Sequence, residues 1–191
     1  MRSGLRAVAY VLKCSGSEYA YERLQTLFDC GDRDPIGAVL EQDASPVDKS
    51  ELLRVYREHE PELQLADAIE KLLTRLVNEM RPMGIITDGR SVTQRNKISA
   101  LGLDKWIDEI VISEEFGSEK PATENYRHFE RVFPDRSYAY IGDNVLKDFV
   151  APNRLGWSTI GLRDGGQNIH TQPLESVPPD RLPQYMIDRI A

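Results

Sequence analysis

The amino-acid sequence predicts a doubly wound, parallel α/β core of the Rossmann-like kind, preceded by a helical domain. From about residue 61 onward, short apolar runs alternate with helical stretches. This alternation is typical of buried strands joined by crossover helices in a parallel sheet. The first sixty residues, in contrast, show only helical and turn patterns. We therefore expect a helical domain over residues 1–60 and an α/β core over residues 61–191.

Helices account for the whole of the first predicted domain. Apolar residues recur there at helical spacing, and turn-forming sequences separate the helices. We expect the helices at residues 3–13, 17–29, 35–42 and 47–58. A stronger amphipathic helix is expected at 65–81. Its apolar face consists of Ile69, Leu72, Leu73, Leu76, Val77 and Met80.

The core is predicted to contain short buried strands. The runs that indicate them are MGIIT (83–87), EIVIS (109–113), YAYIG (138–142) and STIGL (158–162). In parallel α/β sheets, ligands bind beyond the carboxyl ends of the strands. The residues that directly follow each run are therefore the candidates for a functional site.

Composition and charge exclude several functional classes. The chain has 191 residues, of which 40% are hydrophobic and 29% charged, as is usual for a globular protein. A net charge of −7 argues against non-specific binding of nucleic acid. No apolar run approaches the length of a membrane span, and Lys13 interrupts the apolar start of the chain. We expect a cytoplasmic protein that binds neither nucleic acid nor membranes.

The positions of the cysteines and histidines in the sequence do not indicate a metal site. Cys14 and Cys30 form neither a disulfide framework nor a metal-binding motif. The histidines, His59, His128 and His170, lie far apart in the sequence and suggest no zinc site.

Thr87, Asp88 and Gly89 follow the first predicted strand. A threonine hydroxyl beside exposed backbone N–H groups can donate to a phosphoryl oxygen, and glycine permits close approach of a ligand. Taken alone, the same three residues are better explained as an ordinary turn in which Thr87 closes a strand.

Lys120 lies in the segment after the second predicted strand, directly before Pro121. Pro121 is expected to open a helix that carries Tyr126, Phe129 and Val132. A cation is disfavoured ahead of a helix N-terminus, unless an anion lies between the ammonium group and the helix. The alternative is a solvated lysine in an acidic loop.

Asp143 and Asp148 follow the third predicted strand. Two carboxylates directed at one point suit Mg²⁺, which takes few protein carboxylates and keeps several waters. The alternative is that Asp143 caps the following helix. A cap, however, does not require Asp148.

The order of these segments resembles the haloacid dehalogenase (HAD) superfamily of phosphohydrolases. GIITDG, SEKP and GDNVLKDF, continued by APNRLGWSTIGL, carry the resemblance, which spans roughly residues 83–162. Receiver domains, which share a doubly wound fold, present their acids first and their lysine last, and so fit less well. The resemblance implies a HAD core with a helical cap of the C1 type, and the carboxyl-terminal QYMIDRIA is similar to the last strand of the family.

The resemblance also implies a role for each candidate residue. Thr87, with Asp88 and Gly89, would bind the transferring phosphoryl group. Lys120 would neutralise charge on that group, Asp143 would bind Mg²⁺, and Asp148 would support them. The implied activity is Mg²⁺-dependent hydrolysis of a small phosphorylated metabolite, a phosphomonoester, through an aspartyl-phosphate.

No segment of this sequence matches the first strand of the family, which ends in Asp-x-Asp and supplies the nucleophile. Asp32 and Asp34 have suitable spacing, but no apolar run precedes them, and we interpret them as loop and capping residues. Three explanations stay open, in order of preference. The native chain starts further upstream, the chain is a pseudoenzyme that binds a phosphorylated ligand or a protein partner, or a partner chain supplies the strand.

The missing strand has consequences for the chain as it stands. Catalysis by the family mechanism is not expected, and Mg²⁺ binding should be weak or absent. The strands that would flank the missing strand would be left with unpaired edges. We expect either direct pairing of 83–87 with 138–142, or a strand borrowed from another molecule, which would allow homo-oligomers to form by strand exchange.

Overall fold

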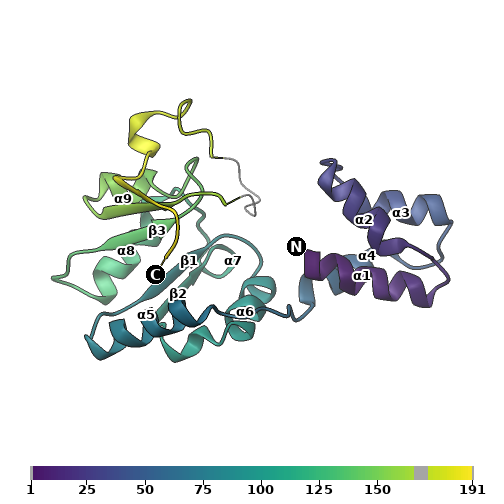
Figure 1. Cartoon of the computed structure of the whole chain (residues 1–191), viewed down its shortest axis with the longest axis horizontal. Coiled ribbons are helices and arrows are strands. Elements are labelled where there is room, and N and C mark those ends of the chain that lie inside the picture. Colours follow the sequence, from purple (N-terminus) through teal and green to yellow (C-terminus); the bar gives the residue numbers. More distant parts are fainter. Residues whose placement is uncertain (1, 166–171, 191) are drawn as a thin grey trace. The chain divides into compact units, whose positions relative to one another are not determined.

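The computed structural model describes residues 2–165 and 172–190 (Figure 1). The chain divides into two compact units. The first unit comprises Met1–Gln64 with Val92–Gly102, and the second comprises Leu65–Ser91 with Leu103–Ala191. The sequence pattern predicted one boundary, after residue 60. It did not predict that the later segment Val92–Gly102 belongs to the first unit. His170 lies outside the described residues.

The first unit is entirely helical in its described residues. It contains α1 (Arg2–Cys14), α2 (Ala20–Asp29), α3 (Pro35–Asp43), α4 (Lys49–Glu58) and the greater part of α6 (Ser91–Ala100). The four helices predicted from the first sixty residues are confirmed, with ends that differ by up to three residues. Their apolar faces meet in one core, which is formed by Leu5, Val8, Ala9, Leu12, Ala20, Leu24, Ile36, Val39 and Leu52.

Asp32 and Asp34 are loop and capping residues, as predicted. The side chain of Asp34 accepts the backbone N–H of Gly37 and caps α3, which begins at Pro35. Asp32 accepts the backbone N–H of Asp34 in the preceding turn. Capping satisfies backbone donors that have no partner within the helix, which explains why both acids lie here.

A partly buried ionic cluster joins α2 to the end of α3. Both terminal nitrogens of Arg23 donate to the carboxylate of Asp43, and the hydroxyl of Ser17 donates to the same carboxylate. The hydrogen bonds from Arg23, followed by that from Ser17, lower the pKa of Asp43. The folded unit therefore favours the ionised form of this carboxylate.

The second unit holds all the strands in the described part of the chain. They are β1 (Gly84–Thr87), β2 (Glu109–Ile112), β3 (Ala139–Gly142), β4 (Ser158–Leu162) and β5 (Tyr185–Ile187). The helices of this unit are α5 (Asp67–Asn78), α7 (Ser113–Phe116), α8 (Thr123–Val132) and α9 (Val150–Arg154), with short 3₁₀ segments at Leu103–Lys105 and Pro179–Arg181. All strand pairs are parallel, so the predicted parallel α/β core is confirmed.

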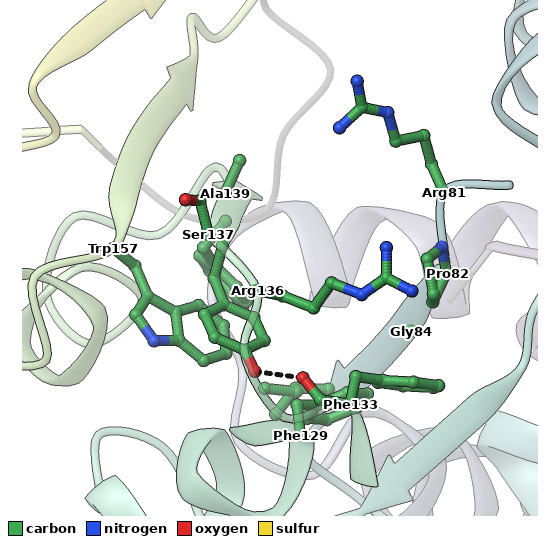
Figure 2. Close-up of a pocket in the computed structure, with 12 residues that line it drawn as sticks. Arg81, Pro82, Gly84, Phe129, Phe133, Arg136, Ser137, Ala139 and Trp157 are labelled. Carbon is green, nitrogen blue, oxygen red and sulfur yellow. Dashed lines mark hydrogen bonds between the residues drawn. The ribbon is translucent and has the colours of Figure 1, made fainter. Parts of the chain in front are cut away.

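The strands form two sheets, β1–β2 and β3–β4–β5. In the first, Thr87 pairs with Ile112; in the second, Gly142 pairs with Gly161. The expected direct pairing of 83–87 with 138–142 is wrong. Side chains line a pocket between β1 and β3, among them the ring of Phe129 from α8 (Figure 2). That ring lies so close to Gly84 that a Cβ there would overlap it.

The core of the second unit is small and aromatic. Its buried members are Val111, Tyr126, Phe129, Ala151 and Trp157. Tyr126 packs edge-on against both Tyr140 and Trp157. Helix α5 has the predicted amphipathic pattern, but none of its residues is buried. In the residues that the structure describes, no helix is both long and apolar enough to span a membrane.

We predict that Asp43→Asn destabilises the first unit at neutral pH and that the difference from the wild type shrinks in acid. A carboxylate with a lowered folded-state pKa stabilises the fold above its unfolded pKa, near 3.9. That stabilisation is lost as the pH falls through the lower folded-state value. Hydrogen exchange of α1–α4 in the variant and in the wild type, at pH 7 and at more acid pH, measures this difference in stability. Asp29→Asn is the control, because Asp29 is exposed and its ion pair with Arg2 is long, at 3.8 Å. An equal loss of stability in this variant would contradict the prediction.

Candidate functional site

The candidate residues converge where β1 and β3 end. Thr87 is the last residue of β1, and Asp143 directly follows β3. Lys120 lies in the loop between α7 and α8, and Asp148 in the turn before α9. Hydrogen bonds and ion pairs connect the segments that carry Asp88, Lys120, Asp143 and Asp148. The structure thus brings together segments that are up to 60 residues apart in sequence.

Asp148 is the buried centre of this network. Only 2% of the residue is exposed. Its Oδ2 accepts the backbone N–H groups of Asp143 and Asn144, at 3.2 and 2.9 Å. Its Oδ1 lies 2.7 Å from the ammonium group of Lys120. Oδ2 is therefore hydrogen-bonded, and Oδ1, which makes no hydrogen bond, is paired in charge with Lys120. Asp148 thus fixes the turn after β3 and the position of Lys120.

Lys120 is anchored through both its main chain and its side chain. Its backbone N–H donates to Oδ1 of Asp88 at 3.0 Å, and its ammonium group donates to the hydroxyl of Tyr140 at 3.3 Å. Its side chain is only 12% exposed. The alternative of a solvated lysine is therefore wrong. The expected helix start at Pro121 is also wrong, because Ala122 is still extended and α8 begins at Thr123.

Asp88 binds two lysine-bearing segments at once. While Oδ1 accepts the Lys120 backbone, Oδ2 forms an ion pair of 2.5 Å with the ammonium group of Lys147. The Asp88 carboxylate therefore joins the end of β1 to the segments that follow β2 and β3. Lys147 was not among the predicted site residues. The sequence places it beside Asp148, but its ion pair spans 59 positions and has no local signal.

Gly89 has a positive φ of 124°, a conformation that favours glycine. Its backbone N–H donates to the hydroxyl of Ser113 at 2.9 Å. This N–H was expected to be open to a ligand, but in the structure it ties the loop after β1 to the start of α7. Ser113 is a second residue that the sequence did not indicate.

Asp143 differs from Asp148 because its carboxylate makes no hydrogen bond or ion pair with a described residue. It is half-buried, and its main chain is held by Asp148 and by Gln172. The alternative that Asp143 caps a helix is wrong, since the next helix, α9, begins only at Val150. Asp148 Oδ1 pairs with Lys120 and Oδ2 accepts two backbone N–H groups, and the binding of one cation by both carboxylates stays a prediction.

Two tyrosines enclose the network on its apolar side. The hydroxyl of Tyr126 donates to the backbone carbonyl of Asp148 at 3.0 Å. Burial raises the pKa of both Tyr126 and Tyr140 well above the ordinary value. Both phenols therefore stay neutral under physiological conditions and act as hydrogen-bonding groups. The apolar wall excludes water from one side of the Lys120–Asp148 pair, which strengthens their attraction.

The fold and the site define an α/β protein with a lysine and carboxylates at the carboxyl edge of a parallel core. The model of the family described as "Haloacid dehalogenase-like hydrolase" matches residues 3–162. The chain belongs to this family, and the resemblance noted in the sequence is confirmed.

Phosphatases are among the proteins to which the chain is similar. It is 36% identical over 110 residues to a glyceraldehyde 3-phosphate phosphatase from Methanopyrus kandleri, covering 56% of this chain and 45% of that protein. It is 32% identical over 130 residues to an N-acylneuraminate-9-phosphatase from Mus musculus, covering 66% and 49%. The chain thus spans about half the length of the curated relatives it matches.

Solved structures support the fold. The structure described as the HAD-hydrolase YfnB from Bacillus subtilis, bound to magnesium, matches with a TM-score of 0.65 at 21% identity. That match covers 97% of this chain and 85% of the other. A HAD phosphatase from Thermococcus onnurineus matches with a TM-score of 0.55 at 18% identity, covering 96% and 83%. A HAD-like, Rossmann-type α/β core is therefore shown.

We predict that Asp148→Ala destabilises the second unit far more than Asp143→Ala does. Removing one partner of a buried ion pair costs about 3–5 kcal/mol, because the other charge is left unpaired. The Asp143 carboxylate has no described partner, and its removal should change stability by about 0.5 kcal/mol or less. Urea unfolding followed by hydrogen exchange of the second unit compares the two variants. Equal losses would show that Asp148 does not hold the site together.

Proposed function

We propose that residues 83–162 form the phosphate-binding and Mg²⁺-binding side of a phosphohydrolase site. The observation that carries the proposal is the half-buried carboxylate of Asp143, which has no described partner beside the Asp148–Lys120 pair. A cation and an anion can bind side by side there. The family membership and the similarity to curated phosphatases support this proposal.

Each residue has a separate role in this proposal. The hydroxyl of Thr87 and the loop of Asp88 and Gly89 contact the phosphoryl group at the end of β1. Lys120 neutralises charge on the phosphoryl oxygens. Asp148 holds Lys120 and the turn after β3 in place, and the Asp88 carboxylate does the same for the loop before α8.

Mg²⁺ fits Asp143 as a site with one protein carboxylate. Mg²⁺ keeps several waters and is commonly bound through one or two carboxylates together with substrate phosphate. Asp148 is a poor second ligand, because its oxygens already serve two backbone N–H groups and Lys120. Residues 2–165 and 172–190 contain no cluster of three or more acidic, histidine or cysteine side chains able to hold a metal ion. When bound, Mg²⁺ would polarise the phosphoryl group.

The substrate in this proposal is a small phosphorylated metabolite, a phosphomonoester. The names of two relatives describe phosphatases of a triose phosphate and of a sugar-acid phosphate. Both are small phosphate esters, and a loop of Thr87 and Gly89 with one lysine recognises the shared phosphate rather than the sugar.

A second candidate function is non-catalytic binding of a phosphorylated ligand. The family mechanism needs a carboxylate that attacks phosphorus, which would make an aspartyl-phosphate. The two carboxylates that contact Lys120, those of Asp88 and Asp148, have internal partners. Sequencing of the genomic region upstream of the first codon separates the candidates. An in-frame apolar run ending in Asp-x-Asp would favour the enzyme, and an upstream stop codon without that run would favour the binding protein.

We predict that Mg²⁺ binds weakly, in the millimolar range, and that Asp143→Asn abolishes the binding. A single carboxylate does not supply the close octahedral set of ligands that makes Mg²⁺ binding tight. Calorimetric titration with MgCl₂ measures the affinity for Mg²⁺. The control is Asp180→Asn, a change at an exposed acid outside the site. Tight binding that survives Asp143→Asn would place the metal elsewhere.

We also predict that the chain of residues 1–191 does not turn over p-nitrophenyl phosphate in the presence of Mg²⁺. Loss of a covalent nucleophile can lower kcat by about a millionfold where catalytic residues act as a unit. The release of p-nitrophenol should equal that of the Asp143→Asn variant. Turnover that Asp143→Asn abolishes would contradict the prediction and would require another carboxylate of this chain to attack phosphorus.

A further inference from the structure

The side chain of Gln172 contacts the candidate site, although this residue comes 29 positions after Asp143 in the sequence. Its Nε2 donates to the main-chain carbonyl of Asp143 at 2.8 Å and to that of Leu162 at 2.7 Å. Its Oε1 accepts the backbone N–H of Asp164 at 2.9 Å. The amide of Gln172 therefore connects the turn after β3 to the end of β4.

A primary amide is the side-chain group that fits these three main-chain partners. Gly142 of β3 pairs with Gly161 of β4. Asp143 and Leu162 are the next positions along the two strands, and two carbonyl oxygens cannot hydrogen-bond to each other. An amide has two N–H donors for the two carbonyls and one oxygen for the N–H of Asp164. A carboxylate or an aliphatic side chain has no donor for either carbonyl.

The peptide group between Asp143 and Asn144 is held at both of its ends. Its carbonyl accepts from Gln172, and its N–H, which belongs to Asn144, donates to Oδ2 of Asp148 at 2.9 Å. The N–H of Asp143 donates to the same Oδ2 at 3.2 Å. The main chain on both sides of the Asp143 side chain is therefore fixed, by Asp148 through N–H groups and by Gln172 through the carbonyl.

The Asp143 carboxylate depends on this main-chain support, because it has no hydrogen bond or ion pair with a described residue. Its position is set by its own main chain. Mg²⁺ demands ligands in near-ideal octahedral geometry, and groups that orient a metal ligand commonly contribute about 10–100-fold to metal affinity. Loss of the Gln172 amide would free the peptide group after Asp143 and, with it, the ligand.

We propose that Gln172 is a positioning residue for Asp143 and that it couples Mg²⁺ binding to the segment that follows β4. This inference rests on the proposed function, in which Asp143 binds Mg²⁺. Gln172 acts through the main chain of the ligand and does not itself contact the ion. Coupling between two events is reciprocal, so bound Mg²⁺ stabilises the Gln172 hydrogen bonds by the same factor by which these bonds strengthen Mg²⁺ binding.

The first experiment compares the wild-type chain of residues 1–191 with Gln172→Met. Methionine has a similar length and no N–H donor, so this change removes the hydrogen bonds to both carbonyls. The probe is MnCl₂, because Mn²⁺ favours the same oxygen ligands as Mg²⁺. Electron paramagnetic resonance measures the free Mn²⁺ during a titration. We expect the Kd for Mn²⁺ to rise by about tenfold in the variant.

Asn153→Leu is the matched control. The Nδ2 of Asn153 also donates to two main-chain carbonyls, those of Asp180 and Leu182, at 3.0 and 2.9 Å. Its Oδ1 accepts the hydroxyl of Thr159, and Asn153 is half-buried, as Gln172 is. None of its partners belongs to the candidate site. Asn153→Leu should lower the stability to urea as much as Gln172→Met does, and it should leave the Kd for Mn²⁺ unchanged.

A second experiment measures the reciprocal effect and needs no substitution of Gln172. Nuclear magnetic resonance follows hydrogen exchange of the Asp164 N–H, which donates to Gln172, with and without saturating MgCl₂. Mg²⁺ should slow this exchange by up to about tenfold in the wild type. In Asp143→Asn, Mg²⁺ should have no effect, because the ligand is lost. This measurement tests the proposal even if Gln172→Met does not fold.

The results separate the failure of this inference from that of the proposed function. If Asp143→Asn abolishes Mn²⁺ binding but Gln172→Met leaves it unchanged, only the role of Gln172 is overturned. An equal loss of affinity in Asn153→Leu, or exchange of Asp164 that does not respond to Mg²⁺, would also overturn that role. Absence of Mn²⁺ binding in the wild type, or binding that survives Asp143→Asn, would show that the proposed metal site is wrong, and the role of Gln172 would fall with it.

Discussion

The buried carboxylate of Asp148 is the constraint on which the rest of the site depends. It lies behind the end of β3, where two backbone N–H groups and the ammonium group of Lys120 converge on it. A buried charge is tolerated only when it is paired and hydrogen-bonded, so these groups have little freedom to move apart. As a result, the turn after β3 is held in one conformation, and the main chain of Asp143 is fixed within it.

Asp88 repeats this arrangement at the end of β1. Its two oxygens bind the backbone of Lys120 and the ammonium group of Lys147. The two carboxylates and the two lysines thus alternate in one network that links the segments after β1, β2 and β3. This network crosses the gap between the two sheets. The carboxyl edge is therefore held together by charges, while the strands behind it are not paired with each other.

The gap and the site have a common physical origin. In a parallel α/β core, central strands supply both the main-chain partners of their neighbours and the residues at the carboxyl edge. Among the described residues, β1 and β3 carry site residues at their carboxyl ends but have one edge each without a partner strand, and α5 has an amphipathic pattern without burying a residue. The proposed binding of phosphate and the proposed binding of Mg²⁺ can each be measured without the other.

Local patterns in the amino-acid sequence were enough to predict the elements and the fold class. Periodicity is a local property, so the four helices of the first unit, the helix α5 and the strands β1–β4 could be predicted to within a few residues. The capping role of Asp34 was predictable for the same reason, because a cap acts over three residues. The motifs GIITDG, SEKP and GDNVLKDF indicated the family and the segments of the site.

The long-range partners of the site residues, in contrast, could be identified only from the three-dimensional fold. The pairing of Asp88 with Lys147, of Gly89 with Ser113 and of Lys120 with Asp148 joins residues far apart in sequence, and no local pattern encodes which of several charges meet. Local patterns also could not show that β1 and β3 lie in separate sheets. Strand pairing depends on contacts between segments that are far apart in the sequence, such as that of the Phe129 ring of α8 against Gly84 of β1.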